Sequence, residues 1–126
     1  MRNLEKYKGV IPAFYACYDK EGNISPEGVQ GLTKYFVKKG VKGVYVNGSS
    51  GECIYQSVED RKIVLENVMK VAEGKLTVIA HVACNNTKDS QELARHAEGW
   101  GRCNRCNSSH LFSLTGICYC TVLECH

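Results

Sequence analysis

The chain has 126 residues, a net charge of +3 and an ordinary composition, with 44% hydrophobic and 23% charged residues, which is typical of a single soluble domain. Its basic residues are scattered, so the charge favours neither a nucleic-acid nor a membrane partner. The polar N-terminus is unlike a signal peptide, and no apolar run approaches the roughly 18 residues of a bilayer span, so we expect a cytoplasmic protein with reduced cysteines.

The first two predicted elements are a strand and a helix. The apolar run 9–17 predicts a buried strand that ends in a loop. Ser25 and Pro26 together predict a helix start, with a serine cap and a proline at the first helical position. Apolar residues then recur at helical spacing until Gly40, which is expected to end the helix. These apolar residues are Val29, Leu32, Phe36 and Val37.

The next two elements repeat this order. Residues 43–47 predict a short second strand. Ser57 is expected to cap a second helix that stops at Gly74. The buried face of that helix is predicted to consist of Ile63, Val64, Val68, Met69 and Val71.

A third strand and helix complete the pattern. Residues 76–83 form a continuous β-branched run, which is typical of strands that are covered on both faces. Thr87 is expected to cap a helix that runs to Gly99. The resulting βαβαβα order implies parallel strands joined by right-handed helical crossovers. Both an open doubly wound sheet and a (β/α)₈ barrel fit this order, and a barrel needs about 250 residues.

The most specific motif is Gly48-Ser-Ser-Gly-Glu52, which follows the second strand. Ligands of α/β folds bind at the carboxyl ends of strands. Two glycines allow a tight turn, and Ser49 and Ser50 offer hydroxyl and backbone N–H donors in one concavity, which suits a carboxylate. The alternative interpretation is a glycine-rich connection with solvated serines.

This motif resembles the signature of the pyruvate-dependent class I aldolases, the dihydrodipicolinate synthase / N-acetylneuraminate lyase family. The resemblance extends over residues 7–99. The synthase branch usually has a Thr-Thr pair in the loop and a Gly-Thr-Gly turn in place of His81-Val82. The segments that resemble the lyase branch are Ile79-Ala-His-Val82, followed by Cys84 and Thr87, and Ser90-Gln-Glu-Leu-Ala-Arg-His-Ala97.

The resemblance implies a fold and a reaction. The fold would be the N-terminal portion, about three βα units, of a (β/α)₈ TIM barrel. The lyase branch cleaves N-acetylneuraminate reversibly to pyruvate and N-acetylmannosamine, through a lysine Schiff base and without a cofactor or metal. Ser49 and Ser50 match the pair that holds the pyruvate carboxylate, although the family more often has threonine at the second position. Full-length members are homotetramers, whereas this chain is expected to remain unassembled.

The same resemblance implies that two catalytic groups are missing. The family's Schiff-base lysine ends the sixth strand and its relay tyrosine ends the fourth, beyond the last unit predicted here. Lys42 and Lys75 precede strands at the opposite rim, and Lys88 opens a helix. We therefore assign no catalytic residue and expect the chain to be inactive. The alternative within the family is a sister aldolase such as dihydrodipicolinate synthase. The alternative of another class is a small carboxylate- or zinc-binding module without catalysis.

Residues 100–126 differ in character from residues 1–99. They contain five of the eight cysteines and follow neither a helical nor a strand period. Cys103-x-x-Cys106 has the spacing of a zinc-ligand pair, and disulfides are a second interpretation. A third is a frameshift after Gly99, because permitted codons read one base later encode GVDAIAAIPPIYF, which resembles the family's fourth strand. We favour the third, so 1–99 is the barrel part and 100–126 a non-native tail without a domain.

Overall fold

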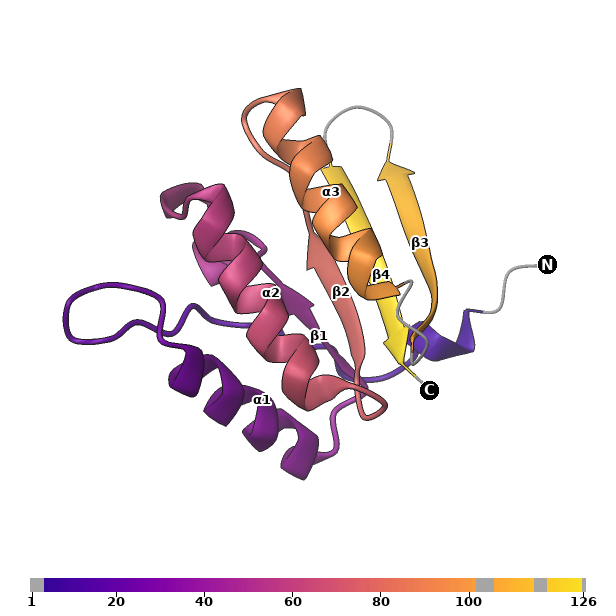
Figure 1. Cartoon of the computed structure of the whole chain (residues 1–126). Helices are drawn as coiled ribbons and strands as arrows, with labels where there is room; N and C mark the ends of the chain where they lie inside the picture. The colour runs from indigo at the N-terminus through magenta and orange to yellow at the C-terminus, as the bar shows by residue number, and fades with distance from the viewer. Residues whose placement is uncertain (1–3, 102–105, 115–117, 126) are drawn as a thin grey trace.

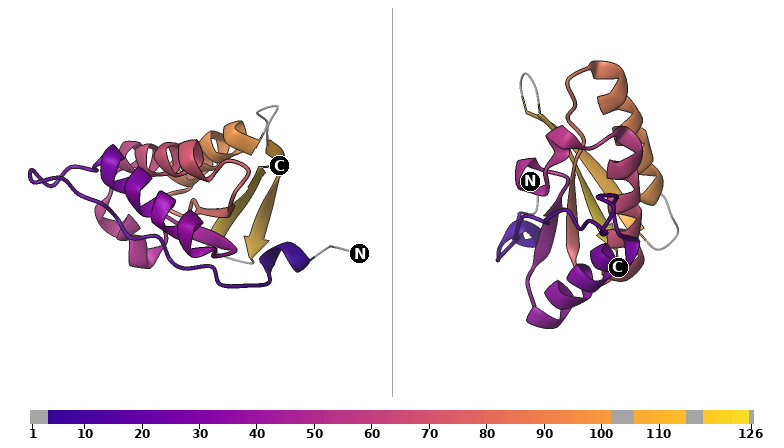
Figure 2. Two further views of the ribbon diagram at one scale, coloured as in Figure 1. Left: turned by 90° about the horizontal axis from the view of Figure 1, so that it is seen from below. Right: turned by 90° about the vertical axis from the view of Figure 1, so that its left-hand side faces the viewer.

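The structure, a computed structural model, describes residues 4–101, 106–114 and 118–125. A four-stranded sheet has the order β1-β2-β4-β3, and three α-helices cover one of its faces (Figures 1 and 2). The helices are α1 (Pro26–Lys39), α2 (Val58–Ala72) and α3 (Thr87–Gly101). The strands are β1 (Gly43–Val46), β2 (Thr77–His81), β3 (Cys106–Leu114) and β4 (Cys118–Cys125).

Helix α1 begins and ends where the sequence predicts. The Ser25 hydroxyl accepts a hydrogen bond from the backbone N–H of Gly28 at 3.1 Å, and Pro26 is the first helical residue. At the other end, Gly40 adopts the left-handed conformation with φ of 73°, which costs glycine little. Both end signals are confirmed.

Helix α2 is confirmed with a small rotation of its buried face. The Ser57 hydroxyl accepts from the Asp60 N–H at 3.1 Å, and the left-handed Gly74 follows the helix end. Three of the predicted core residues are buried, but Ile63 and Val71 are only partly buried. The most buried apolar side chains of this helix are Val64, Leu65, Val68, Met69 and Ala72.

The predicted cap of α3 is wrong by one residue. Thr87 is the first helical residue, and the side chain of Asn86 accepts from the Asp89 N–H at 2.9 Å. The Asn86 amide also donates to the Asp89 carboxylate at 2.8 Å. Both asparagine and threonine are favourable caps, and this reciprocal pair with Asp89 selects Asn86.

Strands β1 and β2 pair in parallel, with Val44 opposite Val78 and Val46 opposite Ala80. These four side chains are buried beneath the helices. The intervening residues of β2 are only partly buried, so the expectation that this strand is covered on both faces is wrong. The reason is that α1, α2 and α3 all lie on one side of the sheet (Figure 2).

The predicted strand at 9–17 is an extended segment with a single parallel bridge, Ala13 to Tyr45. The Phe14 N–H donates to the Tyr45 carbonyl at 2.8 Å, and the Tyr45 N–H donates to the Pro12 carbonyl at 2.9 Å. Pro12 has no N–H, which limits a regular ladder. The segment still runs parallel beside β1, so the order of the first three predicted strands in space is preserved.

Two strands lie in the described part of the tail, although its sequence follows no strand period. Strands β3 and β4 pair antiparallel with each other, and β4 pairs antiparallel with β2, placing His81 opposite Cys120. The free edge of β2 offers unpaired backbone groups, and Thr121-Val122-Leu123 has high strand propensity. The zinc and disulfide interpretations stay untested, because Cys103 lies outside the described residues.

Polar contacts join the three helices above the apolar core. Gln30 of α1 donates to Asn67 of α2 at 2.7 Å, and the Lys62 ammonium on α2 pairs with Glu92 of α3 at 2.7 Å.

In the part of the chain that the structure describes, no helix has the length and apolar character needed to cross a membrane.

Candidate functional site

The predicted motif forms a compact turn directly after β1. We call Gly48–Glu52 the serine turn. Ser49–Gly51 makes one turn of 3₁₀-helix, closed by hydrogen bonds from Gly51 N–H to the Gly48 carbonyl and from Glu52 N–H to the Ser49 carbonyl, both 3.0 Å. Ser49 and Ser50 are both exposed. The structure therefore places two neighbouring hydroxyls at the carboxyl end of a strand, as the sequence predicts.

Glycine is required at two positions of the serine turn. A Cβ added to Gly48 would lie 2.6 Å from the Tyr45 ring, and one added to Gly51 would lie 2.8 Å from the Phe14 carbonyl oxygen. Contacts this short require one partner to move. The turn is thus seated directly against β1 and against the extended segment that precedes α1.

A second set of contacts holds the far end of the serine turn. The Tyr18 hydroxyl donates to the Glu52 carboxylate at 2.6 Å, and the Gln56 amide donates to the Gly51 carbonyl at 2.9 Å. The hydrogen bond to Glu52 raises the pKa of Tyr18. Glu52 itself has a left-handed φ of 60°. These bonds link the turn to the loop that follows residue 17.

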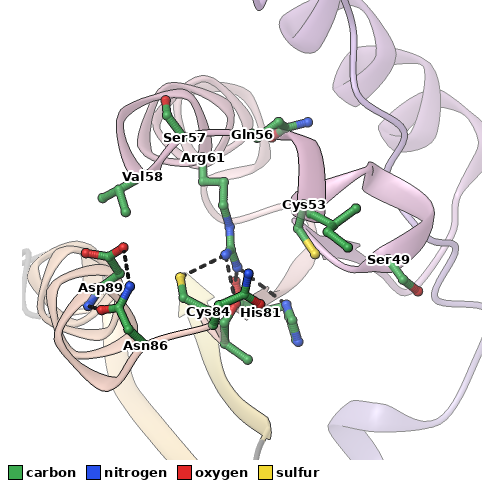
Figure 3. Close-up of a pocket in the computed structure, with 13 residues that line it drawn as sticks. Ser49, Cys53, Gln56, Ser57, Val58, Arg61, His81, Cys84, Asn86 and Asp89 are labelled. Atoms are coloured by element: carbon green, nitrogen blue, oxygen red, sulfur yellow. Dashed lines mark hydrogen bonds between the residues drawn. The ribbon is translucent and has the colours of Figure 1, made fainter.

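A cavity of about 520 Å³ opens between the first turns of α2 and α3 and the carboxyl ends of β1 and β2 (Figure 3). Ser49 lines this cavity, whereas Ser50 is not among its lining residues. The wall also includes Cys53, Arg61, His81 and polar groups from the start of α3. Of the two predicted site residues, only Ser49 therefore lines the wall of this cavity.

Arg61 is a buried residue of the cavity wall that no sequence motif singled out. Its side chain is 3% exposed. It donates to the Ala83 carbonyl at 2.8 Å and to the His81 carbonyl at 2.7 Å, while its Nε is buried without a partner in the described part of the chain. Arg61 lies three residues after Val58 and four before Leu65, on the apolar face of α2. A charged residue at a buried position of a helix is the signal in the sequence that could have identified it.

His81 joins the end of β2 to the end of β1. Its Nδ1 lies 3.0 Å from the Asn47 carbonyl oxygen. Burial and the positive charge of Arg61 lower the pKa of His81, and the hydrogen bond with Asn47 opposes that shift. The net effect favours the neutral imidazole. The Asn47 amide in turn donates to the Arg61 carbonyl at 2.9 Å.

No lysine is found among the 13 residues that line the cavity. Lys42 and Lys88 are exposed, the first ahead of β1 and the second in the opening turn of α3. The hydrogen bond with Glu92 raises the pKa of Lys62, whereas a lysine nucleophile needs a lowered one. The arrangement can bind a small anion through hydroxyl and N–H donors, and it presents no activated amine.

Comparisons with known proteins agree on one family. The model of the dihydrodipicolinate synthetase family matches residues 6–104. Over 101 residues the chain is 99% identical to an N-acetylneuraminate lyase of Mediterraneibacter gnavus, covering 80% of this chain and 32% of the relative. It is 38% identical over 96 residues to N-acetylneuraminate lyase 2 of Escherichia coli O6:H1, covering 76% of this chain and 32% of that protein.

The fold agrees with the sequence matches. The crystal structure of N-acetylneuraminate lyase from Mycoplasma synoviae superposes with a TM-score of 0.74 at 35% identity, over 77% of this chain and 34% of that chain. The described helices and parallel strands are thus the N-terminal portion of a (β/α)₈ barrel. The chain spans about a third of the length of the curated relatives it matches. It belongs to the dihydrodipicolinate synthetase family.

Proposed function

We propose that residues 1–99 are the N-terminal part of an N-acetylneuraminate lyase. Such an enzyme cleaves N-acetylneuraminate reversibly to pyruvate and N-acetylmannosamine through a Schiff base on a lysine. The observation that carries the proposal is the 99% identity over 101 residues to the lyase of Mediterraneibacter gnavus. We call that protein the full-length relative. A sister aldolase of the dihydrodipicolinate synthase type is the alternative within the family.

The serine turn has the properties that this reaction needs from the N-terminal third of the barrel. Hydroxyl and N–H donors of Ser49 and Ser50 would hold the pyruvate carboxylate and fix the neighbouring ketone for attack by an amine. The Schiff-base lysine and the relay tyrosine belong to later strands of the family barrel. The reaction needs neither a metal nor a cofactor, because the protonated Schiff base formed by the lysine and the ketone accepts the electrons of the broken carbon–carbon bond.

We also propose that residues 100–126 are an out-of-frame tail that forms no domain. The match to the full-length relative covers 101 of the 126 residues, which is close to the change of character at Gly99. In the structure this tail pairs antiparallel with β2, whereas a (β/α)₈ barrel is built from parallel strands. Both observations support a foreign C-terminal segment.

Two further features are proposed from the family resemblance. The intact enzyme would act in the cytoplasm, in carbohydrate metabolism, and would assemble as a homotetramer. The 126-residue chain would remain outside that assembly, because it spans only about a third of the barrel.

Removing either hydroxyl of the serine turn should weaken pyruvate binding. We expect Ser49→Ala or Ser50→Ala, made at the matching serine of the full-length relative, to raise the KM for pyruvate at least about tenfold. A hydrogen bond to a charged group contributes about 1.5–3 kcal/mol, and 1.4 kcal/mol is a factor of ten. The measurement is steady-state kinetics in the direction of condensation, with pyruvate varied.

The matched control is Ser25→Ala, which removes the cap of α1 and no hydroxyl of the serine turn. It should lower the melting temperature, because a lost serine cap costs about 1 kcal/mol, but leave the pyruvate KM unchanged. If both serine-turn variants kept the original pyruvate KM, these residues would have no role in holding the carboxylate.

A further inference from the structure

We propose that His81 is a positioning residue for the serine turn, because its Nδ1–H holds the carbonyl of Asn47, the residue that leads directly into that turn. The inference rests on the proposed function, since it assigns His81 a part in pyruvate binding. His81 lies on a different strand from the serines, and its role is to act through Asn47.

Asn47 needs such support because its backbone is in an unfavourable conformation. Its φ is 62°, in the left-handed region, and the residue is 4% exposed. A left-handed residue other than glycine costs roughly 1–2 kcal/mol, although asparagine tolerates it better than most. A buried carbonyl without a partner adds a further cost. The conformation of Asn47 sets the direction in which the chain enters Gly48 and Ser49.

The hydrogen bond fixes the tautomer of His81. A carbonyl oxygen can only accept, so the proton of the neutral ring lies on Nδ1, 3.0 Å from the Asn47 oxygen. The nearest guanidinium nitrogen of Arg61 is 3.4 Å from the same Nδ1, and a guanidinium can only donate. Nδ1 of His81 therefore donates to the Asn47 carbonyl, while the Arg61 guanidinium donates to the backbone carbonyls of His81 and Ala83.

Arg61 and Tyr45 keep the imidazole in place. The guanidinium donates to the His81 carbonyl at 2.7 Å, and the peptide carbonyl of Arg61 accepts from the Asn47 amide at 2.9 Å. The Tyr45 and His81 rings lie with their centroids 6.1 Å apart. Because Gly48 packs on that same Tyr45 ring, the start of the serine turn is enclosed by His81, Arg61 and Tyr45 together.

Two substitutions of His81 separate positioning from general support. The amide nitrogen of asparagine falls near the place of Nδ1, so His81→Asn retains a donor for the Asn47 carbonyl. The longer His81→Gln carries its amide near the place of Nε2 and loses that donor. In the full-length relative, we expect His81→Gln to raise the pyruvate KM about threefold to tenfold, as for one lost hydrogen bond. His81→Asn should stay within about twofold of the unsubstituted enzyme.

A positioning role predicts that the substitution changes the KM for pyruvate alone, whereas a general structural role would change the other kinetic constants as well. Condensation kinetics with each substrate varied in turn should show, for His81→Gln, an unchanged KM for N-acetylmannosamine and a kcat within about twofold. Equal changes in both KM values, a fall in kcat at constant pyruvate KM, or a His81→Asn variant as impaired as His81→Gln would each overturn the proposal.

A second pair of variants applies if His81→Gln does not fold. Asn47→Gly and Asn47→Ala both remove the side-chain amide that donates to the Arg61 carbonyl, but only glycine tolerates the left-handed backbone, so the glycine variant should have the lower pyruvate KM of the two. Asn47→Ala disfavours that backbone and should raise the pyruvate KM above that of Asn47→Gly. An alanine variant equal to the glycine variant would contradict the role of Asn47. These outcomes are independent of the Ser49→Ala and Ser50→Ala results, which test the proposed function itself.

Discussion

The 126-residue chain is expected to form no covalent adduct with pyruvate when the two are incubated with borohydride. Borohydride reduces a Schiff base to a stable amine, so any lysine that condenses with pyruvate is recorded as a mass increase. None of the 13 residues that line the cavity is a lysine, and Lys42 and Lys88 are exposed. An exposed lysine lacks the desolvation or neighbouring cation that activates a lysine nucleophile.

Intact-mass spectrometry provides the measurement, and the full-length relative is the positive control. That protein should gain one reduced pyruvate per subunit under identical conditions. A stoichiometric adduct on the 126-residue chain, located by peptide mapping to one lysine, would contradict the proposed inactivity and would identify a nucleophile within the N-terminal third.

Replacing the tail should restore activity to the same N-terminal residues. We expect a chimera of residues 1–101 with the remaining part of the full-length relative to cleave N-acetylneuraminate with a kcat/KM within about twofold of that relative. The 99% identity over 101 residues leaves about one difference, and most surface substitutions change stability by no more than about 0.5 kcal/mol. The measurement is release of pyruvate from N-acetylneuraminate.

The control for the chimera is the same protein with Ser49→Ala. It should fold and assemble but require a higher pyruvate concentration in the direction of condensation. A chimera that folds as the full-length relative does, and yet releases no pyruvate, would show that residues 1–101 are not a functional part of a lyase.

Local signals in the sequence predicted the helices well. Ser25 and Ser57 cap their helices, and Gly40 and Gly74 mark helix ends, because each of these roles depends on a few neighbouring residues. The predicted cap Thr87 failed because the adjacent Asn86 has a reciprocal partner in Asp89. The strand expected at 9–17 is reduced to one bridge, since Pro12 lacks an N–H.

The candidate site was only partly predictable. The motif located Ser49 and Ser50 on one turn, since a glycine-flanked pair after a strand is a local pattern. The bonds of Arg61 and His81 join segments 14 to 34 residues apart, and no local pattern encodes such pairs. The strands of the tail have no period in the sequence, and their pairing depends on the folded sheet, since β4 pairs with the edge of β2 and β3 pairs with β4.

The nucleotide sequence across the codons for residues 99–102, and downstream of them, tests the central claim most directly. We expect that a shift of one base opens a reading frame that continues the match to the full-length relative, beginning with an apolar strand that ends in a tyrosine. The complete frame should encode about 300 residues, the size of a full barrel with additional helices. If neither alternative frame encoded such a continuation, the assignment of residues 100–126 as an out-of-frame tail would be wrong.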